Sequence, residues 1–420
     1  MGTQKIVYLL TRFPFNIGES YFEDEFECLT EQGADVYMVL PNYQPKNFNK
    51  ESHYEKYLSR TKVFNTELTA WDKIKGIRYL FSKEIWSELH AITSFLQIPL
   101  SGIVLKTMID CYLRARKFEK YFDQYLEDLA EENESIILYS YWCTEYMLSL
   151  LWLKKKYKNI KVFSKMHAWD IYFERNKKGY LPFRKKIFEE VDSFFMVSNQ
   201  GRNFLLNKFP TLDTNKFITS YLGVIEAKNI PQKSTKEPFT ILSLSFVNRV
   251  KRLERLVFAL EKMRHPIRWI HIGDGAGEYE TFKKIIQEKL GANPSVECIL
   301  KGGMSKHKVM EFLDNHYIDL IINCSETEGL PVSLMEAMAR GIPAAAPAVG
   351  GIPEIVENHI TGILLNEVTS PEEVFEAIMY FYQLPESEMA AYRKNAYHMW
   401  KEKFNAKINY SRNFRMIASK

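Results

Sequence analysis

Two carboxylates that could bind a ligand, Glu328 and Glu336, stand eight residues apart near the start of a predicted helix. They belong to residues 325–353, SETEGLPVSLMEAMARGIPAAAPAVGGIP, which follow the short apolar run Ile318–Asn323. This order predicts a buried strand, a tight turn and a helix that ends at a Gly-Ile-Pro sequence. The carboxyl end of such a strand is where an open α/β sheet binds phosphate-bearing ligands. Glu336, two helical turns beyond Glu328, can accept paired hydrogen bonds from a ribose diol.

The backbone of the turn also suits a charged or sugar ligand. Gly329 allows the chain to approach a ligand closely, and Pro331 fits the first helical turn, where its missing N–H costs nothing. We expect the N–H groups around Leu330, Val332 and Ser333 to point at negative charge or at sugar hydroxyls. The alternative is that the turn is only a connector and that the glutamates face solvent.

The elements that position this stretch alternate between predicted strands and helices, which favours parallel sheets. We expect a Rossmann-like domain over residues 1–224, with a helical insertion at about 71–131. A linker rich in proline and polar residues follows over 225–238. We expect a second Rossmann-like domain over 239–398, and a C-terminal helix, 399–420, that packs on the first domain. The predicted fold class is α/β, with a cleft between two sheet domains.

Composition excludes several other classes of protein. The chain has 420 residues and a formal net charge of +4, which is too small to indicate a nucleic-acid-binding protein. Its five cysteines form no CxxC pair, which argues for a reducing compartment and against a disulfide or zinc framework. We see no signal peptide. The longest uncharged run, Ala91–Leu105, is shorter than the roughly 20 residues that span a bilayer. We therefore expect a cytoplasmic protein.

The sequence EGLPVSLMEAMARGIP, followed by VGGIPEIV and TGIL, resembles the signature of the retaining glycosyltransferases of family 4, which have the GT-B fold. That signature is Glu-x7-Glu, here Glu328 and Glu336. The resemblance is strongest over Phe239–Leu365, and weaker landmarks extend it to nearly the full length. It implies that Glu328 contacts the donor sugar and that Glu336 contacts the nucleotide ribose. The implied donor-binding turn consists of Gly329, Leu330, Pro331 and Val332.

A second landmark, SLSFVNRVKRLERLV at Ser243–Val257, resembles the family's loop that places a lysine on the donor diphosphate, and Lys251 fits that position. The family often has an arginine five or six residues earlier, where this chain has serine and phenylalanine. Arg249 and Arg252 are the candidate substitutes for that second cation. A leaving diphosphate needs positive charge as it departs. Because the chain has no Asp-x-Asp sequence, we expect no bound metal.

Two further loops belong to the second half. Residues 272–277, IGDGAG, follow a predicted strand but lack GxGxxG spacing, because the third glycine comes one residue early. This disfavours a dinucleotide-dependent oxidoreductase. Leu300–Met304 matches the place where the resembled enzymes hold the base, so Met304 is a candidate base contact. We expect no cofactor, since the nucleotide-sugar is a substrate.

In the first half, His167 and Asp170 follow a predicted strand and resemble the family's His-x-x-Asp sequence. The resemblance implies that His167 lies near the donor sugar and helps to place the acceptor. The early loop FPFNIGES resembles the family's first loop, whose glycine, here Gly18, approaches the diphosphate. Glu19 and Asp170 are candidate acceptor contacts. The alternative for Glu19 is an ordinary helix-start residue.

The mechanism implied is transfer with retention of anomeric configuration. The diphosphate leaves, an oxocarbenium-like centre develops, and the acceptor hydroxyl attacks from the same face. The departing phosphate oxygen is the expected base, because no carboxylate stands out as a nucleophile. The expected donor is a UDP- or GDP-sugar, and the expected acceptor is a glycan or lipid-linked glycan of a surface polysaccharide. Two alternatives are a non-catalytic partner subunit and a nucleotide-sugar epimerase.

The first half also predicts contact with a membrane. Residues 154–186 hold 12 Lys/Arg against two acidic residues, Asp170 and Glu174, which would suit an anionic lipid surface or a lipid-diphosphate acceptor. Phe81, Trp86, Phe95 and Leu96 add apolar side chains near basic residues. We expect peripheral association with the inner face of the cell membrane. The alternative is a set of solvated helix faces.

Overall fold

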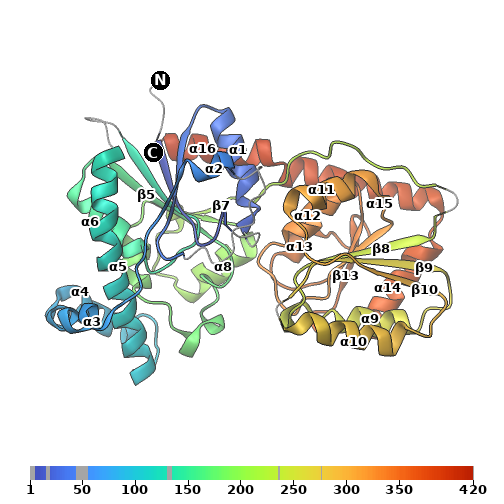
Figure 1. The fold of residues 1–420 in the computed structure, drawn as a ribbon, viewed down its shortest axis with the longest axis horizontal. Helices are drawn as coiled ribbons and strands as arrows, with labels where there is room; N and C mark the ends of the chain where they lie inside the picture. The colour runs from blue at the N-terminus through green and yellow to red at the C-terminus, as the bar shows by residue number, and fades with distance from the viewer. Residues whose placement is uncertain are drawn as a thin grey trace. The chain divides into compact units, whose positions relative to one another are not determined.

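The computed structural model describes residues 5–15, 19–43, 55–129, 135–234, 237–275 and 277–419. The chain forms two units, each with its own sheet (Figure 1). The first unit is Met1–Ser220 together with Asn413–Lys420, and the second is Tyr221–Arg412.

The sheet of the first unit has the strand order β3-β2-β1-β4-β5-β6-β7. Every adjacent pair is parallel. The strands are β1 (Lys5–Leu9), β2 (Asp35–Leu40), β3 (Thr61–Val63), β4 (Ile136–Ser140), β5 (Ile160–Met166), β6 (Ser193–Met196) and β7 (Phe217–Thr219). Strands β1 and β4 are buried along their whole length, as expected of a parallel sheet covered on both faces.

Helices cover both faces of this sheet. The helices of this unit are α1 (Phe22–Glu31), α2 (Glu55–Leu58), α3 (Ala70–Gly76), α4 (Lys83–Ser94), α5 (Gly102–Leu129), α6 (Met147–Lys156), α7 (Arg184–Glu190) and α8 (Asn199–Lys208). Alternate residues of β1 face two separate cores. Val7 and Leu9 pack with α5 and α6, whereas Ile6 and Tyr8 pack with α1 and with Ile417 near the C-terminus.

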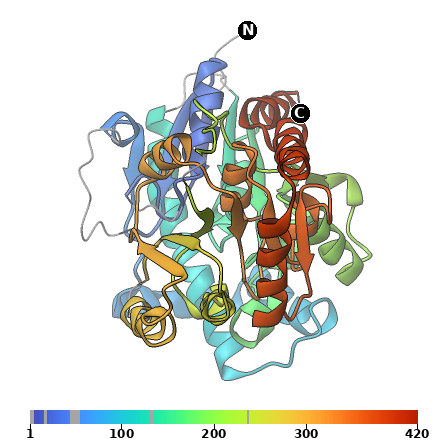
Figure 2. The same ribbon diagram turned by 90° about the vertical axis from the view of Figure 1, so that its right-hand side faces the viewer.

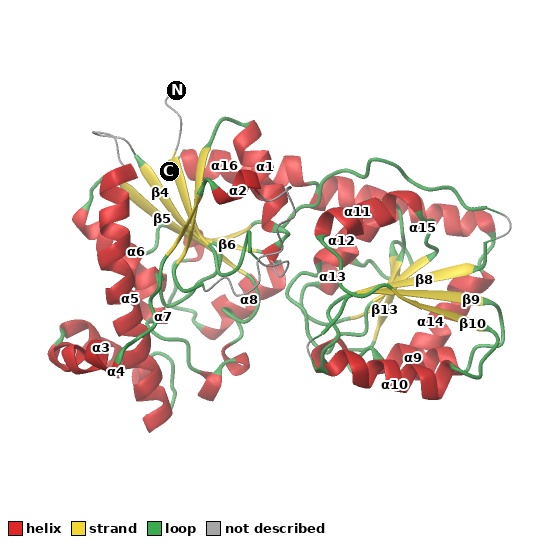
Figure 3. Cartoon of the chain, in the orientation of Figure 1, coloured by secondary structure: helices red, strands yellow, loops and turns green. Residues whose placement is uncertain are grey.

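The sheet of the second unit has the order β10-β9-β8-β11-β12-β13 and is also parallel. The strands are β8 (Phe239–Leu244), β9 (Ile267–Ile272), β10 (Val296–Leu300), β11 (Leu320–Ile322), β12 (Ala344–Pro347) and β13 (Gly362–Leu365). The helices are α9 (Glu254–Glu261), α10 (Glu278–Leu290), α11 (Lys306–Asn315), α12 (Val332–Met338), α13 (Ile352–Ile355), α14 (Pro371–Gln383) and α15 (Glu386–Met399). The last helix, α16 (Ala406–Ala418), belongs to this unit up to Arg412 and to the first unit from Asn413. Helices α9 and α10 lie side by side on one face of the sheet (Figures 1 and 2), and α11 and α12 lie on the other (Figure 3).

Both sheets reverse their strand order at one point. The reversal lies between β1 and β4 in the first unit, and between β8 and β11 in the second. Loops diverge there at the carboxyl ends of the strands, which leaves room for a ligand. These two places are where the chemistry-bearing residues of each unit gather.

The C-terminal helix begins later than residue 399, where the sequence predicts its start. Helix α15 ends at Met399, a π-helical turn follows over Trp400–Phe404, and α16 starts at Ala406. Asn405 forms an isolated parallel bridge with Val224, and the buried Trp400 indole donates a hydrogen bond to the Val224 carbonyl at 3.1 Å. This extra pairing accounts for the break.

No helix in the described part of the chain is both long enough and apolar enough to cross a bilayer. The longest, α5, carries charged residues throughout its length. All five cysteines lie in described segments and are free thiols.

Candidate active site

The strand reversal in the second unit holds an ion pair between two of the predicted site residues. Lys251 comes from the loop after β8, and Glu328 comes from the loop after β11. The Lys251 ammonium lies 2.6 Å from the Glu328 carboxylate. A small pocket adjoins the pair, lined by residues of the same two strand ends, among them Ser245, Asn323 and Ser325. The structure thus brings together two residues that are 77 positions apart in the sequence.

The Glu328 carboxylate is buried and asymmetrically bound. Its Oε1 accepts hydrogen bonds from Lys251 Nζ at 2.6 Å, Ser325 Oγ at 2.6 Å and Asn323 Nδ2 at 3.1 Å. Burial alone would raise the pKa of Glu328, but the charge of Lys251 and these hydrogen bonds hold the pKa below its ordinary value. Oε2 has no hydrogen-bond partner among the described residues, so it is the oxygen that can accept from a ligand.

A glycine-rich turn fixes the position of Glu328. Gly350 approaches so closely that a Cβ there would lie 2.0 Å from the Glu328 carbonyl oxygen, and its φ is +55°. The next residue, Gly351, donates its N–H to the Gly329 carbonyl at 2.8 Å. Only glycine combines this backbone angle with this contact. The VGGIP turn therefore packs on the EGLP turn and holds its backbone in position.

Helix α12 carries Glu336 and starts one residue later than the sequence predicts. Pro331 has an extended conformation and stands before the helix, which begins at Val332. Glu336 is buried, so it does not face solvent. The Arg340 side chain donates to the Glu336 carbonyl at 3.1 Å and forms a buried ion pair with Asp314 of α11 at 2.7 Å. This pair links the α12 end to α11.

One of the two candidates for a second cation, Arg252, already forms an ion pair. The Arg252 guanidinium pairs with Glu326 at 2.5 Å. Arg249 is exposed and has no ion pair among the described residues. Of the two candidates, Arg249 is therefore the one whose charge is not already paired with a residue that the structure describes.

Two neighbouring loops complete this edge of the sheet. The Gly273 N–H donates to the Gly302 carbonyl at 2.8 Å, which joins the loops after β9 and β10. Gly303 packs on the Asp274 carboxylate, 2.4 Å from the position of an added Cβ. Met304 follows in the same loop, half-buried. Met304, the candidate base contact, thus lies in the loop after β10, two strands from β8, the strand that precedes Lys251.

In the first unit, the strand reversal holds Glu19. Its buried carboxylate accepts from the backbone N–H groups of Arg12 at 2.6 Å and Phe13 at 2.9 Å, and from the Trp142 indole at 2.6 Å. Thr11 adds its N–H and hydroxyl. These donors occupy both carboxylate oxygens, so Glu19 positions the loop after β1. For the same reason α1 begins at Phe22 and not at Glu19. Gly18 lies outside the described residues.

His167 stands at the end of β5 as a neutral ring. Burial and the nearby charge of Lys165 lower the pKa of His167 to about 3, despite a hydrogen bond to the Tyr141 carbonyl. Since a carbonyl only accepts, Nε2, at 3.0 Å, carries the proton. Nδ1 has no hydrogen-bond partner among the described residues and is an acceptor. A ring with so low a pKa is a poor general base, so His167 suits the binding of a hydroxyl.

Asp170 is buried and accepts hydrogen bonds from backbone N–H groups, including that of His167. It accepts from the N–H of His167 at 2.8 Å and the N–H of Cys143 at 3.0 Å. Burial raises the pKa of Asp170, although these hydrogen bonds oppose the change. The geometry makes Asp170 a positioning residue for His167. Direct contact between Asp170 and an acceptor stays a prediction.

Two tryptophans that the sequence reasoning did not select lie beside His167. The Trp142 ring stacks on the His167 ring at 4.1 Å between centroids, and on the Trp169 ring at 5.7 Å. Trp169 is exposed and Trp142 is half-buried. Stacked aromatic faces bind the apolar face of a sugar ring. In the sequence, the only sign of this pair is that a tryptophan lies at or just after the end of each of two predicted strands. That sign is weak, because the chain has seven tryptophans.

Metal ligands are not clustered in the described segments: no three His, Cys, Asp or Glu side chains there could together hold a metal ion. Independence of metal stays a prediction.

The second unit matches a known protein family. Residues 225–399 match the family "Glycosyl transferases group 1". The chain is 26% identical over 257 residues to the "Putative colanic acid biosynthesis glycosyltransferase WcaL" of Escherichia coli strain K12. That match covers 59% of this chain and 62% of the relative. A shorter match, 36% identical, covers 17% of this chain and 19% of the amylovoran biosynthesis glycosyltransferase AmsK of Erwinia amylovora. The chain thus spans less than two thirds of these curated relatives.

Solved structures match the whole chain. HepE of Anabaena, in complex with UDP and glucose, superposes with a TM-score of 0.66 at 14% identity, over 99% of this chain and 100% of that one. The lipopolysaccharide outer core galactosyltransferase WaaB superposes with a TM-score of 0.64 at 15% identity, over 99% of each chain. The two parallel-sheet units therefore have the GT-B fold, which confirms the predicted fold class.

Proposed function

We propose that the protein is a retaining glycosyltransferase that moves a sugar from a UDP- or GDP-sugar to a hydroxyl of a glycan or lipid-linked glycan. The observation that carries the proposal is the Lys251–Glu328 pair at the strand reversal of a glycosyl transferases group 1 domain. The relatives named for colanic acid and amylovoran biosynthesis support a role in surface polysaccharide synthesis.

The proposed donor site lies at the carboxyl edge of the second sheet. Lys251 and Arg249 supply positive charge for the departing diphosphate. Glu328 Oε2 accepts from a sugar hydroxyl, Glu336 binds the ribose, and Met304 contacts the base. Glu328 stays ionised near neutral pH because its pKa is held low.

The proposed chemistry needs no carboxylate nucleophile. Three hydrogen bonds hold Oε1 of Glu328 in place, which suits an electrostatic and binding role. The departing phosphate oxygen takes the proton of the acceptor hydroxyl, which attacks from the face that the diphosphate leaves. This sequence retains the anomeric configuration and requires no bound metal.

The proposed acceptor site lies at the carboxyl edge of the first sheet. Trp142 and Trp169 offer a stacking surface for a sugar ring, and His167 Nδ1 accepts from a hydroxyl. Glu19 and Asp170 hold the loops from which these groups project. The proposed location is the cytoplasm, at the inner face of the membrane.

A transfer assay tests the proposal. The purified chain is incubated with UDP- and GDP-sugars and a glycolipid extract, with and without EDTA, and the product is analysed by mass spectrometry and NMR. We expect transfer that EDTA does not abolish, a product of the donor's anomeric configuration, and a fall in kcat of about 100-fold or more for Glu328→Gln, the size typical of a lost transition-state contact. Glu367→Gln, an exposed acid of the same unit, is the matched control. An inverted product would overturn the mechanism.

The same assay separates the two alternatives. A nucleotide-sugar epimerase would alter the donor when no acceptor is present. A non-catalytic partner subunit would bind nucleotide but show no transfer with any donor.

A further inference from the structure

A surface segment of the first unit presents apolar side chains outward. Helix α3 continues into a 3-10 helix, Ile77–Phe81, and four residues of this segment follow helical spacing: Trp71, Ile74, Ile77 and Phe81. Residues spaced in this way share one face of a helix. Their exposed fractions are 69%, 57%, 58% and 82%. The apolar face of this segment is therefore exposed to solvent.

This orientation is held by contacts on the opposite face. Gly76 lies against Leu113 of α5, where a Cβ would come within 2.6 Å of the leucine side chain. The Tyr79 ring packs against the Tyr112 ring at 5.4 Å, and Asp72 forms an ion pair with Lys117 of α5 at 2.9 Å. Helices α3 and α4 lie beside α5, away from the sheet (Figure 1). The exposed stripe is thus a fixed feature of the fold.

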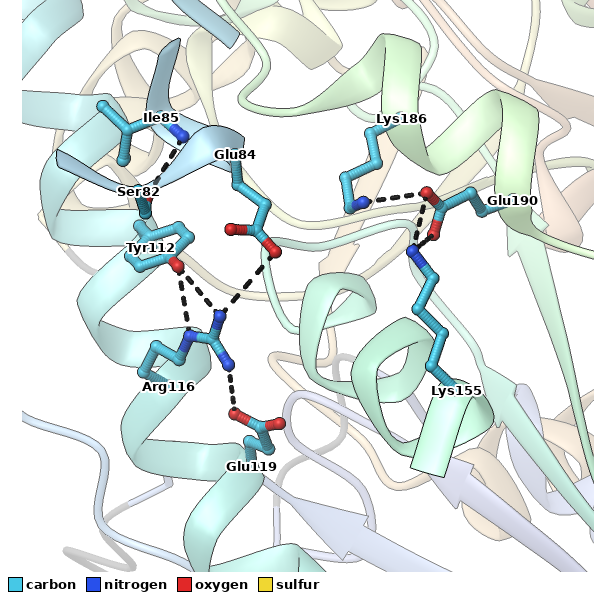
Figure 4. Close-up of polar contacts among 9 residues, drawn as sticks. All are labelled: Ser82, Glu84, Ile85, Tyr112, Arg116, Glu119, Lys155, Lys186 and Glu190. Carbon is cyan, nitrogen blue, oxygen red and sulfur yellow. Dashed lines mark hydrogen bonds and ion pairs between the residues drawn. The ribbon is translucent and has the colours of Figure 1, made fainter. Parts of the chain in front are cut away.

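Unpaired cations surround the stripe. Lys73, Lys75, Arg78 and Lys83 are exposed, and none of them forms an ion pair among the described residues. The two acidic residues between Trp71 and Trp86 are each near a cation of α5: Asp72 pairs with Lys117 at 2.9 Å, and Glu84 lies 3.8 Å from Arg116 (Figure 4). Trp86, one turn into α4, is 61% exposed. The segment combines exposed aromatic rings with net positive charge, as interfacial helices at anionic bilayers do.

Half of the 12 cations predicted to form a surface over residues 154–186 are, in contrast, paired with acidic side chains. Lys155 and Lys186 both point at Glu190, at 2.9 and 2.8 Å (Figure 4). Other ion pairs of these lysines are Lys154–Asp192, Lys156–Asp123, Lys165–Glu25 and Lys185–Glu189. Arg184 is buried. Acidic side chains, most of them distant in sequence, therefore reduce the positive charge of this stretch, while the exposed Lys158, Lys177 and Lys178 form no ion pair among the described residues. Contact of this stretch with a membrane stays a prediction.

Two of the predicted apolar side chains pack against the core of the first unit instead of lying free at its surface. Phe95 stacks on Phe209 at 4.6 Å, and Leu96 belongs to the core of the first unit. Phe81 and Trp86 are the members of the predicted set that reach the surface.

We infer that the segment Trp71–Trp86 is a membrane-docking surface that binds an anionic lipid bilayer. The aromatic and aliphatic side chains of the stripe insert among the lipid head groups, and the four cations pair with lipid phosphates. Charge complementarity selects a bilayer over a second copy of this chain, because two such positively charged stripes repel each other. The inference refines the proposed function by naming the surface that meets a lipid-linked acceptor, but it needs no sugar donor.

Vesicle flotation of the full chain tests this surface. The vesicles are phosphatidylcholine with or without phosphatidylglycerol. We expect binding to the anionic vesicles that weakens as salt is added, and about tenfold or greater loss of binding for the double variant Trp71→Ser/Phe81→Ser. The variant Lys73→Ala/Lys75→Ala should lose the preference for anionic lipid. Because these side chains are exposed, both variants should keep the circular dichroism spectrum and melting temperature of the wild type.

Three controls isolate the surface. Val368→Ser removes an equally exposed apolar side chain, 84% exposed, from the second unit and should not change flotation. Lys155→Ala/Lys185→Ala tests the paired cations of residues 154–186 and should also have no effect. Lys251→Ala should float like the wild type, so failure of the donor site and failure of the docking surface are distinguishable.

Two results would overturn the inference. One is a wild-type chain that does not float with anionic vesicles, or a double variant that floats as well as the wild type. The other is a wild-type dimer in analytical ultracentrifugation that Trp71→Ser/Phe81→Ser converts to a monomer, with flotation unchanged. That result would assign the stripe to a second copy of the chain.

Discussion

At the scale of single residues, the two units use their buried carboxylates in different ways. The second unit keeps a lysine and a glutamate in direct contact at its strand reversal. The first unit instead uses its buried acids, Glu19 and Asp170, to bind backbone N–H groups and so fix loops. Residue type alone does not distinguish these two uses of a carboxylate. The distinction comes from which donors surround it.

The exposed tryptophan beside His167 gives a prediction about the acceptor. Trp169→Ala should raise the KM for a glycan acceptor about tenfold and leave the KM for the donor unchanged, because the ring offers stacking surface but no polar group. Steady-state kinetics with each substrate varied in turn measures the split. The control is Trp86→Ala, which removes an exposed tryptophan of α4 that is distant in sequence from Trp169. Both variants are assayed with a detergent-solubilised acceptor, so that membrane binding does not affect the result. Equal changes in both KM values would contradict the assignment.

A buried acid in the first unit gives a prediction about pH. Burial raises the pKa of Glu88 to about 7, although hydrogen bonds from the Tyr180 hydroxyl and the Phe183 N–H oppose the rise. The folded chain therefore binds more protons than the unfolded chain between about pH 4.5 and about pH 7. The free energy of unfolding should fall as pH rises through that window, by about 3 kcal/mol.

The variant Glu88→Gln isolates this effect. Glutamine keeps an acceptor oxygen for Tyr180 and Phe183 but does not ionise. Urea denaturation at about pH 5 and about pH 8 should show a smaller loss of stability for the variant than for the wild type. An identical loss in both proteins would show that Glu88 does not titrate in this range.

At the scale of elements, the site depends on glycine contacts between loops. Gly350→Ala should destabilise the protein by about 1–3 kcal/mol, because the methyl group meets the Glu328 carbonyl and the backbone angle is left-handed. Donor binding should weaken as well, since the displaced residue carries the site carboxylate. Denaturation midpoints and nucleotide titration measure the two effects.

The matched control for that substitution is Gly102→Ala. Gly102 begins α5, and an added Cβ there meets no atom within 4 Å. The substitution should be neutral or stabilising by about 0.4–1 kcal/mol. Similar losses at Gly350 and Gly102 would mean that the close approach at Gly350 has no role.

Most elements, but not all of their ends, could be predicted from the sequence. Apolar runs and glycine or proline stops are local signals, and they place β8–β11 within two residues. The π-helical turn at Trp400–Phe404 could not be predicted, because it depends on a bridge to Val224, some 180 positions away. The neutralisation of Lys155 likewise depends on Glu190, which lies 35 residues on.

At the scale of the whole molecule, the sequence predicted the GT-B fold from a resemblance in its second half, and the structure shows the same parallel architecture in both units. Spacing in the sequence selected Glu328 and Glu336 as site residues, and their roles stay predictions. Contacts that depend on packing could not be predicted. Trp142 and Trp169 meet only because β4 and β5 are neighbours in the sheet.

The division into two units predicts where a nucleotide should act. UDP or GDP should slow amide hydrogen exchange in the strand-end loops of the second unit, residues 245–253, 301–305 and 323–333, because bound ligand suppresses local opening. The docking segment at 71–86 should exchange at an unchanged rate. Hydrogen-exchange mass spectrometry with and without nucleotide gives both values. Protection confined to residues 71–86 would contradict the placement of the donor site.

The central claim is that the strand reversal beside Lys251 binds the nucleotide of a sugar donor. Isothermal titration of UDP and GDP into the wild type, Lys251→Ala and the control Lys262→Ala tests it most directly. Lys262 is an exposed lysine of the same unit that pairs with Glu372. We predict binding of one nucleotide, at least tenfold weaker in Lys251→Ala, about 1.4 kcal/mol, and unchanged in Lys262→Ala. Equal affinity in all three proteins, or binding of neither nucleotide, would contradict the account.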